Sequence, residues 1–278
     1  MGLYLTQGGK KMKFGCCVNM LATLDDPAGL RWLEKVAAAG FDYVELPVAE
    51  IMLLDDDAFD GLLAKLDSLG LRCESCNNFF PKELKLTGEE RNEEHIQAYL
   101  SRALPRIRSL GAQTIVFGSA GAKNVPQGFP MDVAWEQVAE DLRIISAQMA
   151  AVMPQARVAI EPVCRKESNI LLNYSEGVAM CKKVARENVL CLVDYYHMRM
   201  EDEPVEHLLA NGDLLRHVHI SSREGRSYPM EGDGEDYTIF FEALRRIGYD
   251  GCVSVEGFTN DFAKDARAAL ALFHKKAV

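Results

Sequence analysis

Short apolar runs alternate with amphipathic segments along this chain from about residue 13 onward. Runs such as VLCLVD (189–194) are rich in Val and Leu, which is typical of strands buried on both faces of a parallel sheet. Between the runs, apolar residues recur at helical spacing, and a glycine often follows the last of them, as a helix terminator does. We therefore expect eight strands, at 13–18, 43–46, 71–76, 113–118, 157–162, 189–194, 214–220 and 252–257.

A helix is expected after every one of these strands. Eight strand–helix units with no break in composition predict an α/β fold, a single (β/α)8 TIM barrel over residues 13–278 preceded by an N-terminal extension, 1–12. An open, doubly wound sheet is the alternative, but no G-x-G-x-x-G follows the first strand. The expected helices span 28–39, 57–69, 92–110, 132–152, 175–186, 204–210, 236–247 and 261–275.

The composition is that of a soluble globular protein, with 48% of the 278 residues hydrophobic and 26% charged. A formal net charge of −10 and the lack of clustered Lys and Arg argue against a nucleic-acid partner. No apolar run reaches the roughly 20 residues that span a bilayer, so no membrane partner is expected. The N-terminal stretch, in which Met12 is a candidate for the original start, is not typical of a signal peptide, and we expect a cytoplasmic protein.

The eight cysteines are expected to be reduced in that compartment. Cys73 and Cys76 form a lone C-x-x-C with no second pair at zinc-finger spacing, so a redox or zinc–thiolate role is the weaker interpretation. Most of the others lie within apolar runs, where cysteine packs as a small hydrophobic residue.

Acidic residues and one histidine stand at the expected carboxyl ends of five strands, where a (β/α)8 barrel carries its chemistry. His217 and His219 lie two residues apart in RHVHI, so they point to the same face, with His219 nearer the rim. Glu45 is expected either to contact the substrate or to cap a neighbouring loop. The full set is Glu45, Glu161, Asp194, His219 and Glu256.

The last four of these residues belong to four consecutive strands. Three ionised carboxylates at one rim would repel one another, and a divalent cation would offset that repulsion. Oxygen-rich ligands with a single nitrogen favour Mn²⁺, Co²⁺ or Mg²⁺ over a metal that prefers thiolates. The alternative is that each residue separately caps the helix after its strand, but four in succession favour one metal site.

The segments around these residues carry a resemblance to a known family. IEPVCRKE (160–167), VDYYHM (193–198), HVHI (217–220) and VSVEGF (253–258) resemble the sugar phosphate isomerase/epimerase superfamily of xylose isomerase-like barrels. Within it, the chain is most similar to ketose 3-epimerases of the tagatose/allulose epimerase type. The resemblance covers nearly the whole chain in order, with its specific motifs in the second half.

The resemblance implies a role for each matching residue. It implies that Glu161, Asp194, His219 and Glu256 bind one divalent metal ion, Mn²⁺ first among the candidates, and that Glu161 and Glu256 are the acid/base pair. Glu167 and His197 match positions that hold substrate hydroxyls in the family. The family also implies a sugar substrate and a homo-oligomer, a dimer or a tetramer.

The chain departs from the family pattern at two places. The family usually has Pro after the last Glu, where this chain has Gly257, and its substrate-binding Arg has no gap-free match here. Arg223 and Arg226 flank the expected place, and Arg226 is our choice. The loop in question lies where the far end of the sugar would sit.

The implied reaction is epimerisation of a ketose at C3 through a cis-enediolate, with two Glu residues as acid and base. A lyase that acts on 3-keto-glycosides by the same enediolate chemistry is the first alternative, and a non-catalytic barrel the second. Endonuclease IV, a superfamily relative, requires more metal ligands and a basic groove than six histidines and this net charge provide. Residues 77–80 are expected to form a lid over the sugar or a loop plug, and the Gly/Pro-rich loop 118–130 a further part of the rim.

Overall fold

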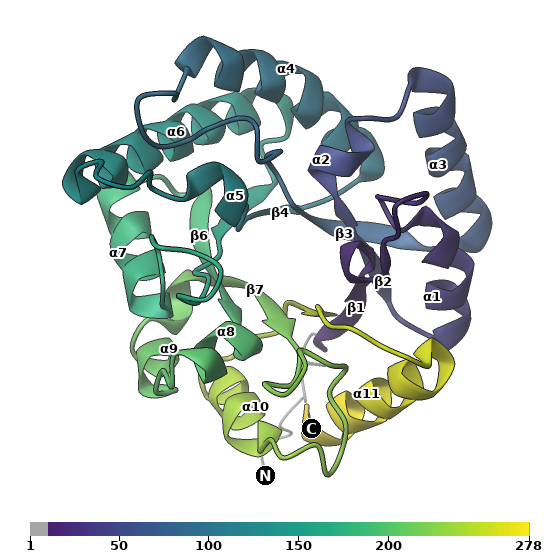
Figure 1. The fold of residues 1–278 in the computed structure, drawn as a ribbon. Coiled ribbons are helices and arrows are strands. Elements are labelled where there is room, and N and C mark those ends of the chain that lie inside the picture. Colours follow the sequence, from purple (N-terminus) through teal and green to yellow (C-terminus); the bar gives the residue numbers. More distant parts are fainter. Residues whose placement is uncertain (1–10, 278) are drawn as a thin grey trace, which may run out of the picture.

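The computed structural model describes residues 11–277, and eight parallel strands close into a barrel in the order β1 to β8 (Figure 1). Residues 1–10 of the expected extension, and residue 278, lie outside the described part, whereas Met12 packs into the core. The closed order confirms the TIM barrel and excludes an open sheet. The strands are β1 (Lys13–Cys17), β2 (Tyr43–Pro47), β3 (Arg72–Asn77), β4 (Thr114–Phe117), β5 (Arg157–Ile160), β6 (Val189–Asp194), β7 (Leu215–Ile220) and β8 (Cys252–Val255).

A ring of helices surrounds the barrel, and further short helices lie in the loops around its mouth (Figure 1). The ring contains α1 (Leu33–Ala39), α3 (Asp56–Leu69), α4 (Glu93–Leu110), α6 (Met131–Val152), α7 (Tyr174–Val184), α9 (Glu206–Ala210), α10 (Tyr237–Arg246) and α11 (Phe262–Lys276). The short helices α2 (Val48–Ile51), α5 (Ala120–Lys123) and α8 (Tyr195–Met200) were not predicted, since four to six residues are too few for a clear periodic signal. The five-residue α9 was predicted because a helix was expected after every strand.

The first helix begins later than predicted, because its expected start is a 3-10 turn at Leu30–Trp32. The carboxylate of Asp26 accepts hydrogen bonds from the backbone N–H groups of Leu30 and Arg31 there, at 2.9 and 3.0 Å. Elsewhere the caps follow the sequence signals. The Asn92 side chain accepts from His95 N at the start of α4, and Gly111 ends that helix with a left-handed φ of 84°.

The interior of the barrel is divided between apolar and polar side chains. Val116, Ala159 and Leu192 of β4–β6 form a small buried cluster of their own, apart from the large core between strands and helices. The polar side is fully buried and is formed by Tyr43, Glu45, Ser75, His217 and Ser254 of β2, β3, β7 and β8. Barrel interiors are usually filled with branched apolar residues, so a buried polar layer is unusual and calls for hydrogen-bond partners.

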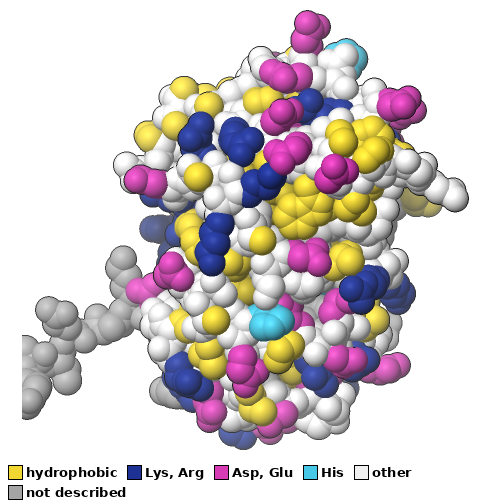
Figure 2. All heavy atoms as spheres, turned by 90° about the vertical axis from the view of Figure 1, so that its left-hand side faces the viewer, with side chains coloured by type: hydrophobic (Ala, Val, Ile, Leu, Met, Phe, Trp, Pro, Cys, Tyr) yellow, Lys and Arg dark blue, Asp and Glu magenta, His cyan; other side chains and the backbone are white. Residues whose placement is uncertain are grey.

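Among residues 11–277, no helix combines the length and the hydrophobicity that a bilayer crossing requires. Figure 2 shows the side of the molecule that carries α6 and α7, where Lys and Arg side chains are interspersed with Asp and Glu.

Candidate active site

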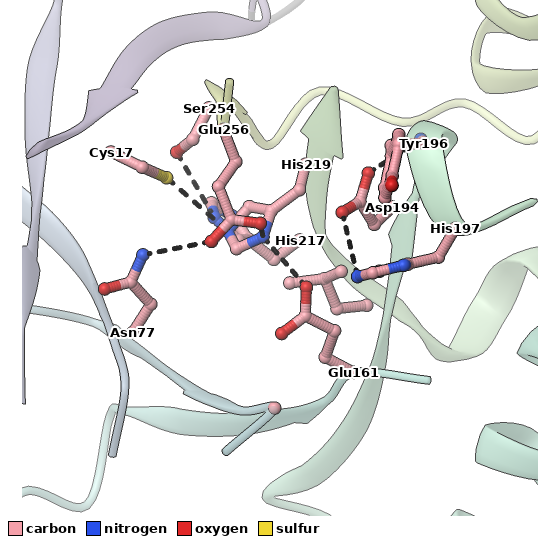
Figure 3. Close-up of polar contacts among 12 residues, drawn as sticks. Cys17, Asn77, Glu161, Asp194, Tyr196, His197, His217, His219, Ser254 and Glu256 are labelled. Atoms are coloured by element: carbon pink, nitrogen blue, oxygen red, sulfur yellow. Dashed lines mark hydrogen bonds and ion pairs between the residues drawn. The ribbon is translucent and has the colours of Figure 1, made fainter. Parts of the chain in front are cut away.

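Four side chains from β5 to β8 meet at the mouth of the barrel (Figure 3). One donor atom from each of Glu161, Asp194, His219 and Glu256 lies within 4.8 Å of the others, and all four residues are buried. Their convergence follows from the two-residue period of a strand, because each stands two residues beyond an interior position of the barrel. The four residues stand two positions after the interior residues Ala159, Leu192, His217 and Ser254, respectively.

The donor atoms of this cluster have the composition of a divalent metal site. His219 Nδ1 lies 3.1 Å from Glu161 Oε1 and 3.4 Å from Glu256 Oε2. Asp194 Oδ1 accepts from Tyr196 N at 2.8 Å and caps α8, whereas Asp194 Oδ2 is buried without a hydrogen-bond partner. Three carboxylates, one imidazole nitrogen and one unpartnered oxygen fit a cation that prefers oxygen ligands. Asp194 thus caps a helix and also faces the cluster.

Nearby positive charge favours the ionised forms of the buried Asp194 and Glu256 carboxylates, because it lowers the pKa of each. Burial raises the pKa of Asp194 to about 7 against the opposing charge of Arg226, and the Glu256 and Glu161 carboxylates raise it further. Burial acts in the same direction on Glu256, but the charges of His219 and Arg226 prevail and hold its pKa well below the usual range. A divalent ion would act on Asp194 as Arg226 acts on Glu256.

Arg226, not Arg223, reaches the cluster. Its Nη2 donates to Glu256 Oε2 at 2.6 Å and lies 3.5 Å from Asp194 Oδ2, while Nη1 lies 3.2 Å from Glu167 Oε1. Arg223 instead forms an exposed ion pair with Asp202. The guanidinium of Arg226 therefore connects the predicted metal ligand Glu256 to Glu167, which is predicted to bind the substrate.

Gly257 allows the Arg226 loop to lie this close. A Cβ atom at position 257 would stand 2.8 Å from the backbone oxygen of Arg226. The neighbouring Phe258 N donates to that same oxygen at 2.7 Å. The two departures from the family pattern are thus in direct contact with each other.

His197 lies beside Asp194 and is 4% exposed, so it is no surface residue. Its Nδ1 accepts from Cys164 N at 3.3 Å, which places the ring proton on Nε2, 3.5 Å from Asp194 Oδ2. Burial, with the charge of Arg226, lowers the pKa of His197 to about 3. The side chain is therefore a neutral hydrogen-bond donor next to the cluster of Glu161, Asp194, His219 and Glu256.

Glu45 neither lies at the rim to contact a substrate nor caps a neighbouring loop, which were the two roles expected for it. It lies inside the barrel and is fully buried. His219 Nε2 is 2.9 Å from its Oε1, and His217 Nε2 is 2.8 Å from its Oε2. Ser75 and Ser254 donate to Oε2 at 2.6 Å each. Glu45, His219 and Cys17 are also close enough to hold a metal, but these bonds already occupy both oxygens of the carboxylate.

The strand ends of β1–β4 bring uncharged groups to the site. Asn77 Nδ2 lies 3.5 Å from Glu256 Oε1, and Phe79 and Phe80 are buried against Tyr99, so residues 77–80 form a plug and not a lid. Gly118 leaves room for Glu161, since a Cβ atom there would stand 1.8 Å from Glu161 Oε2. Sequence reasoning missed this contact, because nothing distinguishes one glycine of a Gly/Pro-rich loop from another.

Lys123, in the loop after β4, is fully buried. Its Nζ donates to the backbone oxygens of Gly118 and Glu161 at 2.8 and 3.2 Å. The side chain therefore links the loop after β4 to the end of β5, and it presents no charge to the rim.

A cavity of about 470 Å³ opens beside the site over β2–β4. Asn78 and Ser119 belong to its lining, and each follows directly on a residue that contacts the cluster, Asn77 or Gly118. The rest of the lining comes from Ala49, Glu50, Leu53, residues 80–83 and residues 120–122.

Comparisons with known proteins agree with the barrel fold. Residues 33–276 match the family model described as Xylose isomerase-like TIM barrel. The chain is 30% identical to a ketose 3-epimerase of Arthrobacter globiformis over 258 residues, 90% of this chain and 84% of that protein. It is 27% identical to a 3-dehydro-D-guloside 4-epimerase of Escherichia coli over 165 residues, 57% of this chain and 62% of that protein. A solved structure of D-allulose 3-epimerase from Methylomonas sp. superposes with a TM-score of 0.82 at 23% identity, over 96% of this chain and 98% of that one.

Proposed function

Because this chain belongs to the xylose isomerase-like TIM barrels, and within them to the sugar epimerases related to ketose 3-epimerases, we propose that it is a metal-dependent enzyme that inverts C3 of a ketose. The observation that carries the proposal is the buried meeting of Glu161, Asp194, His219 and Glu256 at the barrel mouth. These four residues would hold one divalent ion, Mn²⁺ first, with Co²⁺ or Mg²⁺ as alternatives.

The order of the strands supports Glu161 and Glu256 as the acid/base pair. Glu161 follows β5 and Glu256 follows β8, so Asp194 and His219 stand between them around the mouth. A sugar carbon above the cluster would have one glutamate on each side. One carboxylate would take the C3 proton to give the cis-enediolate of the substrate, and the other would return a proton to the opposite face.

The ion supplies Lewis acidity when bound, which lowers the cost of removing a proton next to a ketone. The surrounding residues hold the sugar in place. Neutral His197 offers its Nε2–H, and Glu167 accepts from a hydroxyl while Arg226 fixes its carboxylate. Arg226 would exchange its bond to Glu256 for a substrate oxygen, which frees that carboxylate to move a proton.

The proposal is tested by incubating the purified protein with D-fructose or D-allulose and Mn²⁺ in D₂O. We expect interconversion of the two ketoses on chromatography and one deuterium at C3 by NMR. Stripping the metal with EDTA should lower turnover at least ~100-fold, and added Mn²⁺ should restore it. A protein that binds no divalent ion and gains no thermal stability from Mn²⁺ would instead be the non-catalytic barrel.

The cavity over β2–β4 favours one second candidate, a lyase that acts on 3-keto-glycosides. The cavity of about 470 Å³ is lined by Asn78 and Ser119, the neighbours in sequence of Asn77 and Gly118 at the site, and it would offer room for a group at C1; one relative is named for a 3-dehydro-glycoside. Removal of the C2 proton of such a substrate, next to its C3 ketone, would form a C1–C2 double bond as the bond from C1 to the aglycone breaks, and the aglycone would leave with a proton. Assaying 3-keto-glucosides beside free ketoses separates the two reactions, because only the lyase releases the aglycone.

A further inference from the structure

We propose that Glu45 is a positioning residue for the metal centre, because it fixes the tautomer of His219 and turns Nδ1 of that ring toward the three carboxylates. The inference rests on the proposed metal site. Glu45 contacts none of Glu161, Asp194 and Glu256 by hydrogen bond, so it would act only through the imidazole of His219.

The hydrogen bonds around Glu45 determine where the ring protons lie. An ionised carboxylate only accepts, so each histidine nitrogen beside it has to carry a proton. His219 Nε2 and His217 Nε2 lie 2.9 and 2.8 Å from Glu45 Oε1 and Oε2, respectively. His217 Nδ1 is buried without a partner, as expected of the unprotonated nitrogen of a neutral ring. Both rings therefore carry a proton on Nε2. His219 Nδ1 lies 3.1 Å from Glu161 Oε1 and by the same argument is protonated in the metal-free structure, and a cation would displace this Nδ1 proton to bind the lone pair.

The buried polar layer holds Glu45 itself in place. Ser75 of β3 and Ser254 of β8 donate to Oε2, and the hydroxyl of Tyr43 is 2.7 Å from that of Ser254. Gly15 makes room for the Tyr43 ring, since a Cβ atom there would stand 2.3 Å from it. Metal-binding histidines are generally oriented by such an acceptor on the far nitrogen, whose loss lowers metal affinity about 10–100-fold.

The isosteric change Glu45→Gln tests this role, because an amide has only one accepting atom. The amide oxygen should take the Oε2 place, where two serines and His217 donate, which leaves the NH₂ group facing His219 Nε2. His219 would then have to accept at Nε2 and carry its proton on Nδ1, the nitrogen that the metal needs. We expect calorimetry to show Mn²⁺ affinity lowered about 10–100-fold, with the thermal midpoint of the metal-free protein little changed.

Asp141→Asn is the matched control, since it also exchanges a buried carboxylate for an amide, but on α6, where the partner is Arg91 and no histidine is involved. Its Mn²⁺ affinity should stay within about 3-fold of wild type, well inside the loss expected when a histidine's acceptor is removed. Equal losses in the two variants, or wild-type affinity in Glu45→Gln, would overturn the assignment. Wild-type protein that binds no divalent ion would contradict the proposed function directly, and that result needs no variant.

A measurement on the unaltered chain covers the case in which Glu45→Gln does not fold. Two-bond ¹H–¹⁵N correlations of the histidine-labelled, Mg²⁺-loaded protein report the tautomer of each ring. We expect His217 and His219 both to be protonated at Nε2. A proton on Nδ1 of His219 in the loaded protein would refute the proposal.

Discussion

The two halves of the barrel mouth carry different kinds of side chain. The strands of the late half, β5–β8, bring Glu161, Asp194, His219 and Glu256 to the rim, whereas β1–β4 end in the uncharged residues Cys17, Pro47, Asn77 and Phe117. The early half supplies space and neutral contacts: the cavity lies over β2–β4, and Asn77 faces Glu256. The comparison suggests that the late half performs proton transfer and that the early half determines where the carboxylates and the rest of the substrate lie.

The largest loss of turnover is expected from changes to the two proposed acid/base residues of the late half. Glu161→Gln and Glu256→Gln keep the shape of each side chain but remove the basic oxygen, so each should lower turnover at least ~100-fold. Steady-state assays with D-fructose or D-allulose and Mn²⁺ measure this, with the exposed Glu242→Gln as control. Near-wild-type turnover in either active-site variant would refute the two-base scheme.

The next largest effect is a loss of kcat expected from a side chain added at Gly118 in the early half. Gly118→Ala places a methyl group where Glu161 Oε2 now lies, 1.8 Å from the new carbon, so Glu161 has to move. A displacement of about 1 Å should cost about 10–100-fold in kcat. Gly61→Ala in α3, where a Cβ atom would meet nothing within 4 Å, is the control and should leave kcat unchanged. An unaltered kcat in Gly118→Ala would contradict the prediction that the added methyl group displaces Glu161 from its working position.

A smaller effect is expected at the arginine that faces the late half. Arg226→Lys keeps the charge but loses the fork that contacts Glu256 and Glu167, and KM should rise about 10-fold. Arg223→Lys alters only the geometry of an exposed ion pair with Asp202, and its KM should match wild type. The reverse order of KM values would move the substrate contact from Arg226 to Arg223.

The smallest effect is expected at Lys123, and it concerns stability. The Nζ of Lys123 joins the two halves because it donates to the backbone oxygens of Gly118 and Glu161. Burial lowers the pKa of Lys123 to about 8, below the roughly 10.4 of an exposed lysine, so protonation costs more in the folded state. The free energy of unfolding should therefore rise with pH, by about 1.5 kcal/mol between pH 8 and 9.5. Urea unfolding of wild type and Lys123→Met isolates this term as the difference between the two pH profiles. Parallel profiles would contradict it.

The sequence predicted the late half better than the early half, and the reason is local. Glu161, Asp194 and Glu256 directly follow apolar runs, so the strand period alone places them on one rim. The early half depends on contacts across the barrel. Glu45 meets His217 across 172 positions of sequence, and the need for a glycine at 118 arises only from the path of Glu161. Short helices such as α8 escaped prediction because their few residues carry no helical period.

The close approach of Gly257 to the Arg226 backbone has a consequence for exchanging parts between relatives. A loop taken from an enzyme with proline at this position would bring a different chain path, and the native loop would collide with any side chain at position 257. The segment from Ser221 to Met230 and the glycine that it rests on are therefore best transplanted as one cassette. Chimeras that swap only one of the two should misplace the guanidinium even when every other residue of the mouth is retained.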